Sequence, residues 1–179
     1  MISISLITGE LFFALLWLIY RGIAWCVQKR ICWKKEALLL LMYINLAVII
    51  RFVFYPFFAV EGQVQPLIIQ TSEIFPPRIN LIPFLHILDY ETKREALINI
   101  IGNVALFIPT GIILPILYKR LNGFWKVLLA GAGISFCIEV IQLLLPNSVT
   151  DVDDILLNTA GVIIGYAGYS LVARLIKRT

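Results

Sequence analysis

Apolar residues run along this chain in five long blocks separated by shorter polar segments. A helix needs about 20 mostly apolar residues to cross the hydrocarbon core of a bilayer. Five blocks meet that requirement, and we expect transmembrane helices at residues 5–27, 37–59, 97–118, 124–145 and 152–174. The pattern therefore predicts an all-α fold, a polytopic membrane bundle of five transmembrane helices.

The composition agrees with a membrane protein. Apolar residues make up 60% of the chain, against about 45–50% in a typical soluble domain. The net charge of +4 does not indicate a nucleic-acid partner, because the lysines and arginines cluster beside the apolar blocks, as expected for residues that orient a membrane protein. We therefore expect membrane lipids as partners and no nucleic acid.

The basic clusters also predict the orientation. They follow the first, third and fifth blocks and consist of Lys29, Arg30, Lys34, Lys35, Lys119, Arg120, Lys126, Arg174, Lys177 and Arg178. Because basic loops stay in the cytoplasm, the N-terminus is expected outside and the C-terminus in the cytoplasm. The first basic residue, Arg21, stands near the end of the first block and no basic residue precedes its apolar stretch. This block is therefore expected to remain as a membrane helix and not to act as a cleaved signal peptide.

Residues 60–96 form the one long connection. Four prolines in it are expected to interrupt regular helix. Residues 81–88 are too few to span a membrane and too apolar for open water, so we place them at the outer membrane surface or in a short re-entrant segment.

Strongly polar residues within the blocks concentrate in the half of the membrane that we place outside. With a helical rise of about 1.5 Å per residue, Arg51 and Glu139 both lie about 21–22 Å from the inner ends of their helices. An ion pair between them is therefore geometrically feasible, and pairing is how buried charges are usually tolerated. Further strongly polar residues stand near the start of the third and fifth blocks: Asn99, Asn103, Asp153, Asp154 and Asn158.

Several polar residues recur at intervals of three, four or seven, which places them on common helix faces. The sets are Ser135, Glu139 and Gln142; Asn99, Asn103 and Thr110; and Asp151, Asp154, Asn158, Gly161 and Gly165. Polar stripes at one depth on several helices predict a common polar interior, open to the outside or to the outer leaflet.

Structural roles compete with functional ones for some of these residues. Asp151 and Asp153 stand where a helix N-terminus favours aspartate, and the spacing of Thr150 and Asp153 resembles a capping box. Gly161 and Gly165 form a small-residue packing motif. The asparagines of the third block could bond a neighbouring helix, whereas a mid-helix carboxyl group such as that of Glu139 has no capping explanation.

We expect no cofactor and no metal. The chain has one histidine, His86, and three cysteines without metal-ligand spacing. Ser135 has no histidine placed to activate it in a catalytic triad. The three neighbouring aspartates could in principle hold Ca²⁺ or Mg²⁺, which leaves a divalent cation as the minor alternative.

Four motifs occur in the order and spacing of a known family: NLIPF at 80–84, NIIGNVALFIPTG at 99–111, EVIQ at 139–142 and TDVDDILLNTAGVIIGY at 150–166. Through them the chain resembles the VanZ-like family of small bacterial membrane proteins. The resemblance implies that residues 37–179 form a VanZ-like four-helix membrane domain with outer loop 60–96. Residues 1–36 would then be an additional N-terminal helix and basic loop. Many members carry an arginine where this chain has Ser148, so no role of that arginine carries over.

The founding member of that family is associated with resistance to teicoplanin, a lipid-tailed glycopeptide antibiotic. The resemblance implies a multi-pass protein of the bacterial plasma membrane that lowers susceptibility to lipoglycopeptides. It would engage the drug's lipid tail, a lipid-linked cell-wall precursor, or the lipids around them. The resemblance adds Asn80 to the candidate site, which then comprises Glu139, Gln142, Asp151, Asp153, Asp154, Asn158, Asn99, Asn103, Arg51 and Asn80.

Two other classes of function stay open, although a non-enzymatic role is preferred. The first is an intramembrane enzyme acting on a polyprenyl phosphate or another envelope lipid, with Glu139 as general base and a cation held by aspartates. The second is a small transporter or lipid flippase, with Glu139 and Arg51 as a switching pair.

Overall fold

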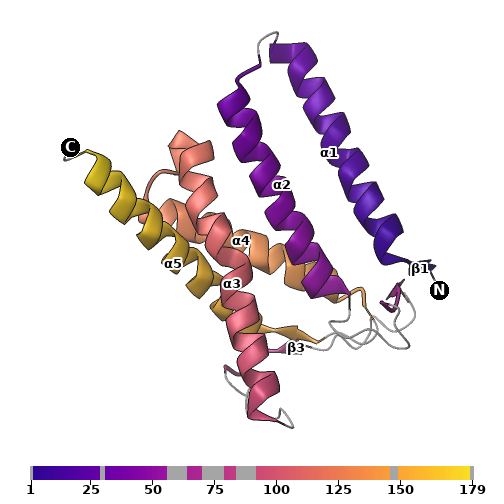
Figure 1. The fold of residues 1–179 in the computed structure, drawn as a ribbon. Helices are drawn as coiled ribbons and strands as arrows, with labels where there is room; N and C mark the ends of the chain where they lie inside the picture. The colour runs from indigo at the N-terminus through magenta and orange to yellow at the C-terminus, as the bar shows by residue number, and fades with distance from the viewer. Residues whose placement is uncertain are drawn as a thin grey trace.

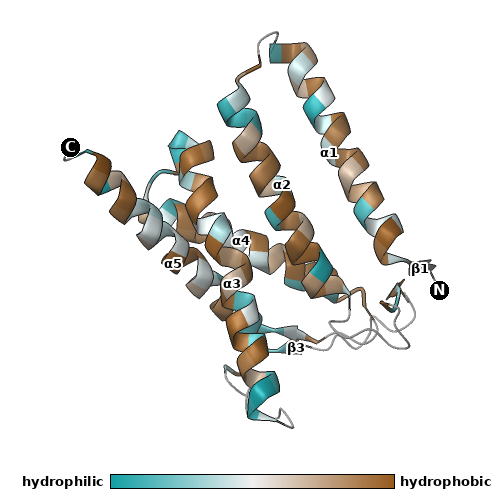
Figure 2. Ribbon diagram, in the orientation of Figure 1, coloured by the Kyte–Doolittle hydropathy of each residue, from teal (hydrophilic) through white to brown (hydrophobic). Residues whose placement is uncertain are grey.

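The computed structural model describes residues 2–28, 31–55, 64–69, 79–83, 92–145 and 149–177. Five helices are long and apolar enough to cross a membrane: α1 (Leu6–Gln28), α2 (Trp33–Phe54), α3 (Lys93–Leu117), α4 (Phe124–Gln142) and α5 (Val152–Ile176). Figure 2 shows hydrophobic residues along most of their length, with hydrophilic residues in the first turns of α3. The predicted five-helix membrane bundle is confirmed.

Among the helix boundaries that differ from the prediction, two have clear local reasons. Helix α2 ends at Phe54 and not at residue 59, because Tyr55 is extended and precedes a proline, a position that disfavours helix. Helix α3 begins at Lys93 and not at residue 97, because the side chain of Thr92 caps it by accepting a hydrogen bond from the Glu95 amide at 3.2 Å.

Two small sheets were not expected from an all-α pattern. Strand β1 (Ile2–Ile4) pairs antiparallel with β2 (Leu67–Ile69), and β3 (Ile79–Asn80) pairs parallel with β4 (Thr150–Asp151). Strands β2 and β3 belong to the long connection, which the second sheet ties to the start of α5. The apolar segment 81–88 lies mostly outside the described residues, so its expected position at the membrane surface stays a prediction.

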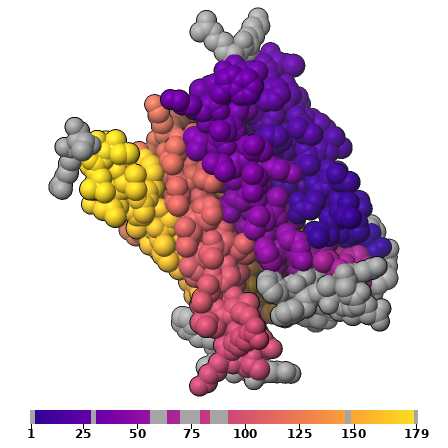
Figure 3. All heavy atoms as spheres, in the orientation of Figure 1, coloured from indigo at the N-terminus to yellow at the C-terminus, as the bar shows by residue number. Residues whose placement is uncertain are grey.

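Helix α3 occupies the middle of the bundle. It packs against α2, α4 and α5, while α5 also packs against α4 and α1 packs against α2. Figure 3 shows α2 lying between α1 and α3. The most deeply buried apolar side chains include Ile49, Phe107, Val127 and Val162, which form one core shared by α2, α3, α4 and α5.

The helices alternate in direction. The N-terminus, both sheets and the end of α2 lie on the lower side of Figure 1. The end of α1, the start of α2 and the end of α5 lie on the upper side. A short 3₁₀ helix, η3 (Lys119–Leu121), connects α3 to α4. Five helices of alternating direction, each long enough to cross, predict termini on opposite sides of a membrane. Which side faces the cytoplasm stays a prediction from the basic clusters.

We predict that a cysteine at Asn122 is protected from an impermeant maleimide in intact cells, whereas one at Thr92 is labelled. Both positions are exposed, and they lie at opposite ends of α3. The background would carry serine at Cys26, Cys32 and Cys137, which are free and exposed. Labelling at Asn122 without labelling at Thr92 would reverse the orientation.

Candidate functional site

A buried polar cluster forms where the end of α4 meets the start of α5 and strand β3. We call it the polar cluster; its members are Asn80, Glu139, Gln142, Asp151 and Asp153, all of which are buried. Pairing of β3 with β4 sets Asn80 directly opposite Asp151. The Asn80 amide nitrogen donates to Asp151 Oδ1 at 3.0 Å, while its oxygen accepts from the Ile82 amide at 3.0 Å. Asn80 therefore joins the long connection to the helix bundle.

Asp151 links three parts of the cluster. Its side chain caps α5 by accepting from the Asp153 amide at 2.9 Å, and its own amide donates to Glu139 Oε2 at 3.0 Å. The capping-box pattern of Thr150 is thus not used. The Thr150 hydroxyl instead donates to the backbone oxygen of Glu139 at 2.9 Å. Adjacent residues of β4 therefore bind the side chain and the backbone of the same glutamate.

Glu139 is 2% exposed and accepts hydrogen bonds from neutral groups. Besides the Asp151 amide, its donor is Gln142, one turn further along α4. With the Gln142 carboxamide turned so that its nitrogen faces the glutamate, that nitrogen lies 2.9 Å from Oε1 and 3.2 Å from Oε2. Hydrogen bonding of this kind offsets the cost of removing a carboxyl group from water.

A polar contact continues from the cluster into the bundle. One turn before Glu139, the Ser135 hydroxyl accepts from the Asn158 amide nitrogen of α5 at 2.9 Å. Both residues are almost fully buried. Within the part of the chain that the structure describes, the Asn158 side-chain oxygen has no hydrogen-bond partner.

A second polar contact connects α3 to the start of α5. The Asn103 amide nitrogen donates to Asp154 Oδ1 at 2.6 Å and lies 3.5 Å from Asn99 Oδ1. These three residues are partly exposed, unlike the polar cluster. The predicted polar interior therefore has two parts: a closed one around Glu139 and a more open one at Asn103 and Asp154.

The expected ion pair between Arg51 and Glu139 is wrong. The Arg51 guanidinium donates to the backbone oxygen of Tyr55 at 3.3 Å and lies within electrostatic range of Glu10 on α1. Among the described residues the ion pair that forms is Arg21–Glu36, near the turn between α1 and α2. Helical rise placed Arg51 and Glu139 at similar depth, but depth alone does not show which faces of α2 and α4 meet.

One buried polar residue was missed by the sequence reasoning. Asn45 of α2 donates to the Leu106 backbone oxygen at 2.9 Å and accepts from the Thr110 hydroxyl at 2.7 Å. The signal was available, because Asn45 is the one strongly polar residue between Ala37 and Ile50. A lone asparagine in an apolar block does not form a polar stripe with a helical period, so the periodicity did not single it out.

The site is rich in acceptors but not arranged as a metal centre. In the described part of the chain, no three histidine, cysteine, aspartate or glutamate side chains surround one point. The carboxyl groups of Glu139, Asp151 and Asp154 instead accept hydrogen bonds from separate side-chain and backbone amide donors. Such an arrangement can bind hydrogen-bond donors of a ligand at its open edge, at Asn103 and Asp154. His86, Arg78 and Ser148 lie outside the described residues.

Fold and site together define a multi-pass membrane protein with a buried carboxyl cluster at one end of its helix bundle. A family model described as VanZ/LLP1 matches residues 38–173. The chain belongs to this family. A comparison with curated proteins found no match, and a comparison with solved structures found none.

Proposed function

We propose that this protein lowers susceptibility to teicoplanin or related lipid-tailed glycopeptides from the extracytoplasmic face of a bacterial plasma membrane. Membership of the VanZ/LLP1 family supports the proposal, since the family's founding member is associated with teicoplanin resistance. The polar cluster also supports the proposal, because it lies at the end of the bundle that the basic residues predict to face outside.

The observation that carries the proposal is the closed hydrogen-bonding environment of Glu139. A carboxyl group at membrane depth is costly and marks a functional site by default. Glu139 is too buried to contact a large ligand. We therefore assign it a positioning role, in which it holds Asp151 and Gln142 through its two oxygens.

The ligand itself would meet the partly exposed residues Asn99, Asn103 and Asp154. These residues supply mainly acceptor oxygens, and a glycopeptide or a lipid-linked cell-wall precursor offers many N–H and O–H donors. A hydrocarbon tail would remain among the apolar helices while the polar head reached this edge. Binding of either molecule would shield the drug's target without chemical turnover.

We predict that expression of the chain in a susceptible Gram-positive host raises the inhibitory concentration of teicoplanin several-fold and leaves that of vancomycin unchanged. Glu139→Gln is expected to lose this protection while still folding. A carboxamide retains shape and one acceptor oxygen for the Asp151 amide, but it cannot also accept from Gln142 through a second oxygen.

The matched control is Glu10→Gln, which alters a partly buried membrane carboxyl group on α1 at the same end of the bundle. It is expected to retain protection. Equal protection by Glu139→Gln and the unmodified chain, at equal expression, would remove Glu139 from the site. No protection from well-expressed unmodified protein would overturn the resistance proposal itself.

A further inference from the structure

A groove lies between the start of α4 and the second half of α5, at the end of the bundle opposite the polar cluster. We call it the α4–α5 groove. It has a volume of about 480 Å³, and ligand sites usually have about 300–1,000 Å³. Phe124 lines it on α4, and the rest of its lining belongs to α5 between Ile163 and Arg174. Figure 3 shows the last turns of α5 at the edge of the bundle, where lipid can reach them.

Two rows of side chains on α5 line the groove. Each row steps by four residues, so its members lie on one helix face. The apolar row consists of Ile163, Ala167 and Leu171. The neighbouring row consists of Tyr166, Ser170 and Arg174. The second row becomes more polar toward the end of the helix, so the groove offers hydrocarbon along its length and a cation at one end.

The length of the groove corresponds to one leaflet. Ile163 and Arg174 lie about 16 Å apart along α5 at a rise of about 1.5 Å per residue, which is close to half of a hydrocarbon core about 30 Å thick. Arg174 lies about 33 Å along α5 from its first residue, Val152, and a long basic side chain at that depth reaches the head groups. A lipid of this leaflet can therefore place its acyl chain in the groove and its phosphate beside Arg174.

The charge at this end of the bundle favours an anionic occupant. No acidic residue occurs at 96–138 or after Asp154, and the basic residues of these two stretches are Lys119, Arg120, Lys126, Arg174, Lys177 and Arg178. Glu36 lies at the same end of the bundle, but it accepts from the Arg21 guanidinium. Among the described residues, Arg174 therefore has no acidic side chain as a counter-ion.

The groups around Arg174 complement a phosphate. A guanidinium can donate two parallel hydrogen bonds to phosphate oxygens. Ser170, one turn earlier on the same face, has a hydroxyl that bonds no other group in the described part of the chain. Further from the end, the rings of Tyr166 and Phe124 meet edge to face with centroids 5.9 Å apart and close the apolar part of the groove.

We propose that the α4–α5 groove binds an anionic phospholipid, with its phosphate at Arg174 and Ser170 and an acyl chain along the apolar row. The apolar row selects a lipid over a small soluble anion, because it stays uncovered without hydrocarbon. The uncompensated positive charge selects a head group of net negative charge over a zwitterionic one, whose own cation would lie near Arg174. This inference does not depend on the proposed role in drug susceptibility.

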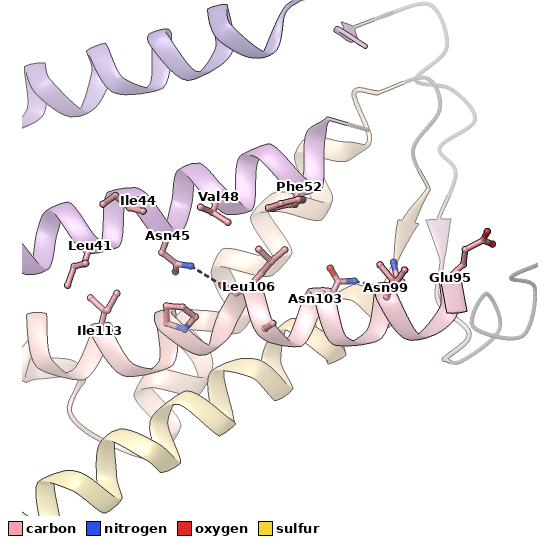
Figure 4. Close-up of a pocket in the computed structure, with 14 residues that line it drawn as sticks. Leu41, Ile44, Asn45, Val48, Phe52, Glu95, Asn99, Asn103, Leu106 and Ile113 are labelled. Carbon is pink, nitrogen blue, oxygen red and sulfur yellow. Dashed lines mark hydrogen bonds between the residues drawn. The ribbon is translucent and has the colours of Figure 1, made fainter. Parts of the chain in front are cut away.

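The larger groove between α2 and α3 gives an internal comparison. Figure 4 shows side chains of both helices facing it, and none of the residues that line it is basic. Acyl chains can contact this groove without regard to the charge of their head group. A general affinity of the protein for lipid would therefore affect both grooves.

The test is photo-crosslinking of the full chain in phosphatidylcholine nanodiscs that contain a small fraction of phosphatidylglycerol with a diazirine on one acyl chain. A parallel sample carries the same diazirine on phosphatidylcholine. Peptide mass spectrometry locates the adducts. The anionic probe is expected to give several-fold more adducts than the neutral probe at the α4–α5 groove, and equal numbers at the groove between α2 and α3.

Two pairs of variants separate the head site from the chain site. Arg174→Gln should bring the anionic probe down to the level of the neutral one, whereas Lys119→Gln removes the same charge from an exposed residue outside the groove and should change little. Ala167→Leu fills the groove and should reduce adducts of both probes several-fold. Gly168→Leu alters the next residue, which does not line the groove and whose added Cβ meets nothing within 4 Å, and should leave them unchanged.

Equal labelling of the α4–α5 groove by the two probes would overturn the proposal. The same excess of anionic adducts at both grooves would also overturn it, because the preference would then belong to the whole surface. Both readouts use the unmodified chain, so the proposal can fail even if a variant does not fold. Equal losses in Arg174→Gln and Lys119→Gln would likewise replace a defined site with general attraction to positive charge.

Discussion

Replacing Gly161 with leucine is expected to prevent stable folding of the bundle. A Cβ at this position would collide with the backbone oxygen of Val104 on α3 and come within 3.1 Å of Phe107 Cβ. A helix backbone cannot yield as the end of a flexible side chain can, so α5 would have to move away from α3. Overpacking of a buried site costs about 1–3 kcal/mol of stability and at times more. Because the collision here is with backbone, we expect a loss at the upper end of that range.

Two further glycines make local relief at this crossing difficult. A Cβ at Gly165 would collide with the Ile108 backbone oxygen, and one at Gly111 with that of Val162. Both α3 and α5 thus carry small residues at the crossing, as is common where membrane helices approach closely. Separation of α3 from α5 would also break the bond between Asn103 and Asp154.

The measurement is the thermal unfolding midpoint of the purified protein in detergent, monitored by the loss of the monodisperse peak in size-exclusion chromatography. Gly168→Leu is the matched control, because it lies on the same helix and its added Cβ would meet nothing within 4 Å. Gly161→Leu should be aggregated or much less stable than this control. Indistinguishable midpoints for the two variants would contradict the close packing of α3 on α5.

Helical periodicity predicted the buried face of α4 well. Ser135, Glu139 and Gln142 share one face by spacing alone, and the structure buries all three. The five helices followed from the length of the apolar blocks. Both results depend on regular geometry within one helix, which the sequence determines locally.

Contacts between helices were not predictable in the same way. Helical rise predicted similar depths for Arg51 and Glu139, yet in the structure Arg51 donates to the Tyr55 backbone oxygen and Glu139 accepts from the Asp151 amide. The pairing of β3 with β4 depends on how the long connection folds back. Strands of two residues are too short to show a hydrophobic period, so the sequence does not predict this pairing. The bond between Asn80 and Asp151 therefore had to come from the structure.

Replacing Asp151 with leucine is expected to have the second large effect on stability. The change removes the N-cap of α5 and leaves the Asn80 amide nitrogen without its acceptor in a buried position. Loss of a cap costs about 0.5–2 kcal/mol and a buried unsatisfied donor about 1–3 kcal/mol. We therefore expect a loss of about 2–4 kcal/mol in the free energy of unfolding.

Asp151→Asn distinguishes this explanation from a general intolerance of the position. Asparagine caps helices about as well as aspartate, and its side-chain oxygen can accept from both Asn80 and the Asp153 amide as Oδ1 does now. Unfolding in detergent by a denaturant titration should rank Asp151→Asn near the unmodified chain and Asp151→Leu far below it. A large loss in both variants would show that the negative charge of Asp151 stabilises the fold, and not only its ability to accept hydrogen bonds. The polar cluster would then have to contain a cationic partner for Asp151 besides its neutral donors.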